Sequence, residues 1–175
     1  KLWTLEDAIE LIREKFPYFL DFFTSKTEFP ILKCDIFRYI LMYQYGGIYT
    51  DLDFVCLKEV DQLLLKLSAR DLTMKFSSTT DNNIILSEEW EDSSTITSTL
   101  HNGILISLKA LHPFWLKLIH EIYNDLILSK RHIQYQEDVF TCTGTKKLWT
   151  FYSTNMHCFK DICILPYYYF CPYYA

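Results

Sequence analysis

One stretch of this 175-residue chain carries most of the structural information: Tyr45-Gly46-Gly47-Ile48-Tyr49-Thr50-Asp51-Leu52-Asp53. The paired glycines predict a tight turn, because glycine adopts the left-handed conformation that ends a helix without a Cβ clash. The apolar and β-branched residues that follow predict a strand over residues 48–55. Side chains alternate along a strand, so Asp51 and Asp53 would share one face while Leu52 points the other way.

The acidic pair at the end of this expected strand favours a metal site. Two carboxylates a few ångströms apart repel each other, and they are costly to desolvate without a countercharge. Mg²⁺ or Mn²⁺, held by carboxylate oxygens, waters and a diphosphate, supplies that charge. In open α/β sheets ligands gather beyond the carboxyl ends of the strands, which is where this pair is expected. An Asp-x-Asp pattern alone is also common on solvated surfaces, so its position after an apolar strand is what gives it weight.

The residues before the glycines predict a helix from about residue 33 to residue 45 with a broad apolar face. Asp35 and Arg38 are three residues apart and therefore lie on one face of that helix. If the face is exposed to solvent, the pair contributes only about a few tenths of a kcal/mol. If the glycine turn instead folds the helix onto the strand, this pair and the acidic pair line the same cleft.

Helix and strand patterns alternate along the rest of the chain, which predicts an α/β fold with a largely parallel sheet. Thr4 followed by Asp7 is typical of a helix start, and Pro17 ends that helix. The other expected elements are helices over residues 57–67 and 113–129, strands over residues 72–76, 84–87 and 103–107, and a surface loop over residues 88–99. We expect one domain over residues 1–175, cut from a longer chain at both ends, because the sequence lacks an initiator Met and stops within an aromatic stretch.

Composition excludes several classes of protein. Half of the residues are hydrophobic and 17% are aromatic, which excludes a disordered tail. No stretch approaches the roughly 20 consecutive apolar residues that span a bilayer, so we expect no membrane segment within this chain. The net charge of −5 argues against a nucleic-acid partner. The six cysteines form no CxxC pair, so we expect buried free thiols rather than a zinc site, with one or two disulfides as the alternative.

The combined pattern resembles a known family. The sugar-binding region of the DXD-containing glycosyltransferases is similar to Asp35-Ile36-Phe37-Arg38-Tyr39 followed by Gly46-Gly47-Ile48-Tyr49-Thr50-Asp51-Leu52-Asp53. This group includes the initiating α-1,6-mannosyltransferases of yeast and the α-1,4-galactosyl- and N-acetylglucosaminyltransferases. Asn102, before the strand over residues 103–107, and the turn Thr143-Gly144-Thr145 extend the resemblance more loosely. Thr145 stands where the family has proline, which leaves the geometry of that turn open.

The resemblance implies a GT-A (Rossmann-like) α/β fold that binds a nucleotide sugar and Mn²⁺ (or Mg²⁺). Asp53 would ligate the metal directly, with Asp51 close to the donor ribose and to a metal-bound water. Asp35, Arg38 and Asn102 would contact the donor sugar, and Arg38 would also face the phosphates as a fixed, always-charged fork.

The resemblance further implies a retaining transfer of a sugar from a UDP-sugar or GDP-mannose to a glycan, a protein or another hydroxyl acceptor, with Asp51, Asp53 and Arg38 as the catalytic residues. The compartment stays open: the secretory lumen for a eukaryotic protein of this type, the cytoplasm for a bacterial or viral one.

Alternative interpretations remain. The segment Asp51-Leu52-Asp53-Phe54-Val55 also resembles the first motif of the haloacid-dehalogenase phosphatases, but that class leaves the glycine pair and Asp35/Arg38 unexplained. A domain that binds a sugar nucleotide without transferring the sugar is a second alternative. The aromatic run over residues 167–170 is expected to form a packed strand or, alternatively, a platform for the acceptor.

Overall fold

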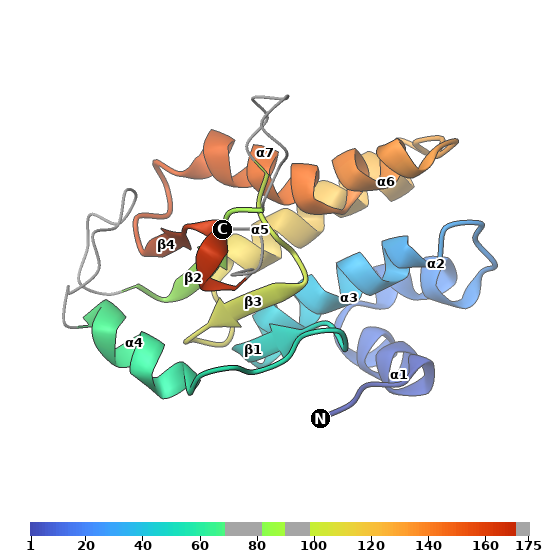
Figure 1. Ribbon diagram of the computed structural model, residues 1–175. Coiled ribbons are helices and arrows are strands. Elements are labelled where there is room, and N and C mark those ends of the chain that lie inside the picture. Colours follow the sequence, from blue (N-terminus) through green and yellow to red (C-terminus); the bar gives the residue numbers. More distant parts are fainter. Residues whose placement is uncertain (69–81, 90–98, 171–175) are drawn as a thin grey trace.

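The computed structural model describes residues 1–68, 82–89 and 99–170 (Figure 1). The elements, in chain order, are α1 (Leu5–Lys15), η1 (Pro17–Phe19), α2 (Leu20–Thr24), α3 (Ile31–Gln44), β1 (Gly47–Thr50), α4 (Val60–Ser68), β2 (Ile84–Ser87), β3 (Ile104–Ser107), α5 (Pro113–Ile122), η2 (Tyr123–Leu128), α6 (Gln136–Cys142), α7 (Thr145–Asn155), β4 (Ile162–Leu165) and η3 (Tyr167–Tyr169). The predicted α/β class is thus confirmed at the level of a mixed α/β fold. The strand expected over residues 72–76 and most of the loop expected over residues 88–99 lie outside the described residues.

The N-terminal part follows the expectation closely. At the start of α1, Thr4 Oγ1 accepts a hydrogen bond from the Asp7 backbone N–H at 3.2 Å, and the Thr4 N–H donates to Asp7 Oδ2 at 2.9 Å. This reciprocal capping satisfies two backbone donors that the first helical turn leaves unpaired. The helix ends just before Pro17, as predicted.

The glycine pair ends α3 as predicted. Gly46 and Gly47 have φ angles of 64° and 81°, in the left-handed region that favours glycine. A Cβ at Gly46 would also lie 2.9 Å from the Ser107 carbonyl oxygen, so the turn presses directly against the end of β3. Space and backbone conformation therefore both require glycine at position 46.

The sheet has the strand order β1-β3-β2-β4. Strand β3 is antiparallel to both of its neighbours, with Tyr49 of β1 opposite Leu105, and only β2 and β4 are parallel, with Ile84 opposite Ile162. The prediction of a largely parallel sheet is therefore wrong for the described strands. Consecutive strands such as β2 and β3 need only a chain reversal to pair, whereas the parallel pair is joined through the helices α5, α6 and α7.

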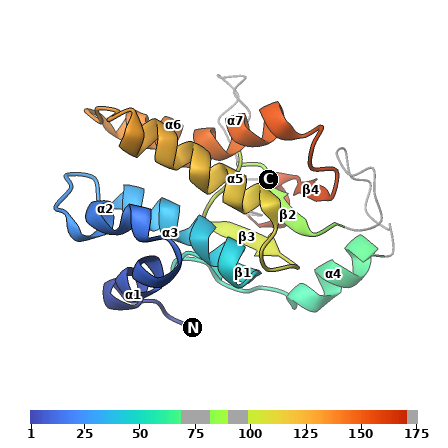
Figure 2. The same cartoon turned by 180° about the vertical axis from the view of Figure 1, so that it is seen from behind.

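Helices cover both faces of the sheet (Figures 1 and 2). On one face, Ile84 and Leu86 belong to the large apolar cluster that also contains side chains of α3 and α5. On the other face, Ile85 packs with Leu67 of α4 in a smaller cluster. The side chains of β2 thus alternate between two buried layers, as expected for a strand covered on both sides.

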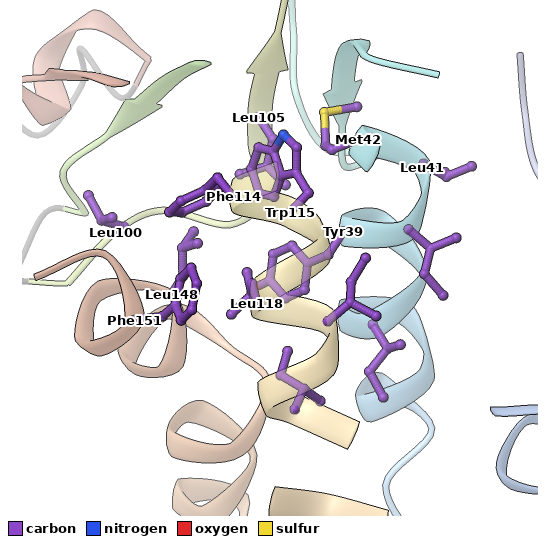
Figure 3. Close-up of a cluster of buried hydrophobic side chains, with 14 of the residues drawn as sticks. Tyr39, Leu41, Met42, Leu100, Leu105, Phe114, Trp115, Leu118, Leu148 and Phe151 are labelled. Atoms are coloured by element: carbon purple, nitrogen blue, oxygen red, sulfur yellow. The ribbon is translucent and has the colours of Figure 1, made fainter. Parts of the chain in front are cut away.

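Helices α3 and α5 pack side by side in the larger cluster (Figure 3). Tyr39 of α3 and Trp115 of α5 stack with their ring planes 16° apart and their centroids 6.1 Å apart. Both side chains are fully buried. Helix α3, which carries Asp35 and Arg38, is therefore a core element rather than a surface helix.

The C-terminal part departs from the expectation in two places. The helix expected over residues 113–129 begins at Pro113, where the His112 side chain caps it, but it changes to a π-helical segment, η2, after Ile122. Residues 167–169 form a single 3-10 turn, so the prediction of a packed strand there is wrong. No helix among the described residues is long and apolar enough to cross a bilayer.

Candidate functional site

Arg38, in the middle of α3, is the centre of a buried polar cluster. Its side chain is 4% exposed, as is that of Asp35. The guanidinium Nη2 lies 3.3 Å from Asp35 Oδ1, and Nη1 lies 3.2 Å from Asp51 Oδ2. Nη1 also donates a hydrogen bond to the Asn102 carbonyl oxygen at 2.7 Å. One side chain thus connects α3, the segment after β1 and the segment before β3.

The third nitrogen of the guanidinium, Nε, differs from Nη1 and Nη2. Arg38 Nε is buried and has no hydrogen-bond partner among the residues that the structure describes. The Tyr49 ring lies against the guanidinium, with its centroid 5.1 Å from Cζ. This cation–π contact holds the guanidinium plane without satisfying the Nε–H.

Both carboxylate oxygens of Asp35 are occupied by protein donors. Oδ1 accepts from Asn102 Nδ2 at 3.0 Å, and Oδ2 accepts from Thr143 Oγ1 at 2.8 Å. Burial raises the pKa of Asp35 above its usual range, while the Arg38 charge and the two hydrogen bonds oppose that shift. The interpretation of Asp35 and Arg38 as an exposed surface pair is therefore wrong, because α3 lies inside the fold.

Asp51 lies just after β1, and both of its carboxylate oxygens are also engaged. Oδ2 faces Arg38, and Oδ1 accepts a hydrogen bond from the Tyr49 hydroxyl at 2.7 Å. The Asp51 backbone N–H donates to the Gly103 carbonyl oxygen at 2.8 Å. Burial raises the pKa of Tyr49, so its hydroxyl keeps the proton that it donates.

The strand expected over residues 48–55 ends at Thr50, so the argument from strand alternation is wrong for Asp51 and Asp53. The chain turns there, with the Phe54 N–H donating to the Asp51 carbonyl oxygen at 3.3 Å. Asp53 is exposed, and within the described residues its carboxylate has no hydrogen bond or ion pair. The turn therefore gives the two acids different roles: one is anchored in the cluster and one is free to face solvent.

His101 and Gly103 complete the surroundings of Asp51. A Cβ at Gly103 would lie 2.8 Å from Asp51 Oδ2 and 2.7 Å from His101 Cε1, so only glycine leaves room for both side chains. His101 Nδ1 accepts the Gly103 backbone N–H at 2.9 Å, so the neutral ring carries its proton on Nε2. Burial of the ring lowers the pKa of His101, which favours that neutral form.

The acidic pair fits a divalent cation only with help from a ligand. No group of three or more His, Cys, Asp or Glu side chains in the described parts of the chain could hold a metal ion. Mg²⁺ and similar hard cations are commonly held by one or two carboxylates plus substrate phosphates and waters. Asp53, exposed and without a partner within the described residues, suits a direct ligand, whereas Asp51 already accepts from Tyr49 and Arg38.

The structure thus brings together Asp35, Arg38, Asp51 and Asn102, four of the five residues predicted from the sequence, and it leaves Asp53 at the exposed edge. Their individual roles toward a ligand stay predictions. Sequence reasoning missed the contacts of Thr143, His101 and Gly103, although the first had been noted as part of a turn. The one available signal was the resemblance of the Thr-Gly pair at residues 143–144 to a family motif.

Residues 3–69 match the family described as the glycosyltransferase sugar-binding region containing DXD motif. The resemblance predicted from the sequence is therefore confirmed for the part of the chain that carries Asp35, Arg38, Asp51 and Asp53. Asn102 and the later elements lie outside this match.

The similar curated proteins are mannosyltransferases of fungi. Mannosyl phosphorylinositol ceramide synthase SUR1 of Saccharomyces cerevisiae is 46% identical over 63 residues, which cover 36% of this chain and 16% of that protein. Inositol phosphoceramide mannosyltransferase 1 of Schizosaccharomyces pombe is 42% identical over 65 residues, covering 37% and 20%. The initiation-specific alpha-1,6-mannosyltransferase of Candida albicans is 56% identical over 32 residues, covering 18% and 8%.

The matched part of the chain spans a fifth or less of each of these relatives. No solved structure matches the chain. The matched family is a glycosyltransferase sugar-binding region, and the names of the relatives describe proteins that transfer or attach mannose.

Proposed function

We propose that this chain holds the donor-binding site of a metal-dependent glycosyltransferase that transfers mannose from GDP-mannose to a hydroxyl acceptor with retention of configuration, on a GT-A fold. The observation that carries the proposal is the buried cluster of Arg38 with Asp35, Asp51 and Asn102 beside the exposed carboxylate of Asp53. The names of the similar proteins favour mannose over other sugars, and two of them favour an inositol phosphoceramide as the acceptor.

The charges of the site are consistent with a cation and a diphosphate. Asp35 and Asp51 both contact the single guanidinium of Arg38, and the carboxylate of Asp53 lies two residues beyond Asp51 with no ion pair among the described residues. The carboxylates thus outnumber the cationic groups in this part of the site, which favours a bound cation. Because the Asp53 carboxylate is exposed, a cation there would keep open coordination positions for phosphate oxygens and water.

Transfer breaks the bond between the sugar and the phosphate, so negative charge develops on the departing nucleoside diphosphate and positive charge develops on the anomeric carbon. A bound Mn²⁺ or Mg²⁺ would act as a Lewis acid toward the departing diphosphate. Arg38 supplies a second, permanent positive charge, and its contacts to Asp35 and Asp51 fix it before any ligand arrives. Such preorganised charge is worth more in a buried cluster than in water.

The test is a panel of thermal unfolding measurements with GDP-mannose, GDP, UDP-glucose and UDP-galactose, each with and without Mn²⁺. A ligand that binds only the folded state at 100 times its Kd stabilises it by about 2.7 kcal/mol. We expect stabilisation by GDP-mannose and GDP with Mn²⁺ and none by the UDP-sugars. Stabilisation by the UDP-sugars but not by GDP-mannose would show that the donor is a UDP-sugar. No stabilisation by any of the four ligands would contradict the proposal.

A second measurement separates an enzyme from a binding domain. Mn²⁺-dependent release of GDP from GDP-mannose, with water as the acceptor, is expected from a transferase. Tight binding without any release of GDP would favour a domain that binds the sugar nucleotide without transfer.

A further inference from the structure

Thr143 lies in the short turn between α6, which ends at Cys142, and α7, which begins at Thr145. Its side chain is completely buried. It lies within hydrogen-bond distance of Asp35, a residue 108 positions away in the sequence. The turn therefore reaches the interior of the fold beside the polar cluster around Arg38.

Two hydrogen bonds join Thr143 to one face of α3. Its hydroxyl donates to Asp35 Oδ2 at 2.8 Å, and its carbonyl oxygen accepts from the Tyr39 hydroxyl at 2.8 Å. Asp35 and Tyr39 are four residues apart, so they lie on neighbouring turns of the same helical face. Helix α3 is thus bonded to the turn at two successive positions.

The hydroxyl of Thr143 has one proton, and the geometry assigns it to Asp35. The alternative acceptor, the Val139 carbonyl oxygen, lies 3.5 Å away, at the limit of a hydrogen bond. The bond to Asp35 is also the stronger one, because a hydrogen bond to a charged acceptor is roughly twice as strong as one between neutral groups.

The consequence concerns the other oxygen of Asp35. With Oδ2 held by Thr143, Oδ1 is turned toward Arg38 Nη2 at 3.3 Å and Asn102 Nδ2 at 3.0 Å. Without the hydroxyl, only the contacts of Oδ1 to Arg38 and Asn102 would hold the carboxylate, which would then have more freedom to rotate about its Cβ–Cγ bond. The Asp35 contacts of Arg38 and Asn102 are therefore supported by a side chain that lies outside the region matched by the family.

We propose that Thr143 is a positioning residue of the donor site: its hydroxyl fixes the Asp35 carboxylate, which in turn fixes Arg38 and Asn102 for the nucleotide sugar. This inference rests on the proposed function, because the ligand it names is the donor of that reaction. In this proposal the turn between α6 and α7 acts on the donor site through the hydrogen bond from Thr143 to Asp35, and Thr143 itself does not touch the ligand.

A purely structural role for Thr143 makes a different prediction. A residue that only holds α6 and α7 against α3 would lower the free energy of unfolding when changed, but it would leave the donor affinity of the folded protein unchanged. The chain offers a matched control in Thr145, a buried threonine at the first position of α7 with no hydrogen bond from its side chain among the described residues.

The experiment measures the Kd of GDP-mannose with Mn²⁺ by titration calorimetry for the wild type and for Thr143→Val, Thr143→Ser and Thr145→Val. Urea unfolding of each variant shows that the measurement is made on folded protein. We expect Thr143→Val, which replaces the hydroxyl with a methyl group of similar size, to weaken binding about tenfold, equivalent to about 1.4 kcal/mol. Thr143→Ser, which keeps the hydroxyl, and Thr145→Val should bind within about twofold of the wild type. If Thr143→Val does not fold, Thr143→Ala carries the same expectation.

The outcomes distinguish a failure of the role of Thr143 from a failure of the proposed function. Wild-type affinity in folded Thr143→Val, or an equal loss in Thr145→Val, would overturn the role of Thr143 and leave the proposed function intact. Weaker binding of GDP-mannose by Thr143→Val, together with wild-type affinity in Thr143→Ser, would support the role of Thr143. If the wild-type chain binds no GDP-mannose, the proposed function fails first, and the role of Thr143 toward that donor fails with it.

Discussion

The Arg38 guanidinium and the Asp51 carboxylate meet at 3.2 Å across the turn formed by Gly46 and Gly47. A core helix and the acidic segment after β1 therefore share one ion pair, and the position of the acidic segment depends on the helix. The same turn leaves Asp53 exposed, two residues beyond the anchored acid.

Asp53→Asn should remove the proposed metal ligand while the fold stays intact, because Asp53 is exposed and has no hydrogen bond or ion pair among the described residues. We expect Mn²⁺-dependent release of GDP from GDP-mannose to fall at least about 100-fold, since even residues that only support a metal ligand contribute 10- to 100-fold. Steady-state kinetics at several Mn²⁺ concentrations measure the effect. Asp21→Asn, at an exposed acid on α2, is the control and should stay within about twofold of the wild type. Full activity in Asp53→Asn would contradict a metal site at this turn.

Arg38→Met should destabilise the fold by about 3–5 kcal/mol, because it leaves the buried carboxylate of Asp35 without its countercharge. Adding Asp35→Asn removes that carboxylate, so the double variant should be less destabilised than the sum of the two single variants. Urea unfolding of the four proteins in this double-mutant cycle gives the coupling energy. Strictly additive effects would show that the two side chains do not act as a buried pair.

Arg38→Lys keeps the positive charge but loses the fork that reaches Asp35, Asp51 and the Asn102 carbonyl oxygen at once. We expect this variant to be more stable than Arg38→Met, yet to bind GDP-mannose at least about tenfold more weakly than the wild type. Calorimetry on folded protein measures the affinity. Wild-type affinity in Arg38→Lys would mean that the site uses the charge alone and not the geometry of the guanidinium.

Gly103→Ala should disturb the site more than the fold. The added methyl group would lie 2.8 Å from Asp51 Oδ2 and 2.7 Å from His101 Cε1, so one or both of these side chains must move. We expect a loss of about 1–3 kcal/mol in unfolding free energy from overpacking, together with about tenfold weaker binding of GDP-mannose as Asp51 shifts from Arg38. An unchanged affinity would indicate that Asp51 moves without consequence for the donor.

The cysteines give a prediction that is independent of the site. Cys34, Cys56, Cys142 and Cys158 are free thiols, as predicted, but only Cys142 among them is buried, so the prediction that these thiols are buried is wrong for the other three. Burial raises the pKa of Cys142 to about 11, so at pH 8 only about one thiol in a thousand is ionised and reactive. Alkylation with iodoacetamide followed by mass spectrometry should label the exposed thiols first, and Cys142 only after denaturation. Rapid labelling of Cys142 in the native protein would contradict the packing of α6.

Sequence patterns within a few residues predicted much of the fold, because helix capping and backbone conformation depend on neighbouring residues. The Thr4–Asp7 cap and the two left-handed glycines follow from backbone geometry within a few residues. The strand directions could not be predicted in the same way, because the pairing of β1 with β3 joins segments that stand more than 50 residues apart. The alternation of helix and strand patterns therefore predicted the α/β class correctly but predicted the wrong strand directions.

For the candidate site, too, local features were predicted from the sequence and contacts between distant segments were not. The spacing of Asp35 and Arg38 predicted that they share a helical face, yet their burial depends on the packing of α3 against α5. The bond from Thr143 to Asp35 spans 108 residues, and no pattern within one segment could have predicted it. Asp51 and Asp53 were recognised from their types and spacing, but their difference in exposure comes from a strand that ends one residue before Asp51.

The central claim is that Asp53, beside the anchored Asp51, holds a divalent cation together with the diphosphate of the donor, and electron paramagnetic resonance of Mn²⁺ tests it most directly. With GDP-mannose and the wild-type protein, we predict a bound Mn²⁺ spectrum with hyperfine coupling to ³¹P that is lost in Asp53→Asn. A Mn²⁺ spectrum in the presence of GDP-mannose that is identical with and without the protein would contradict the claim.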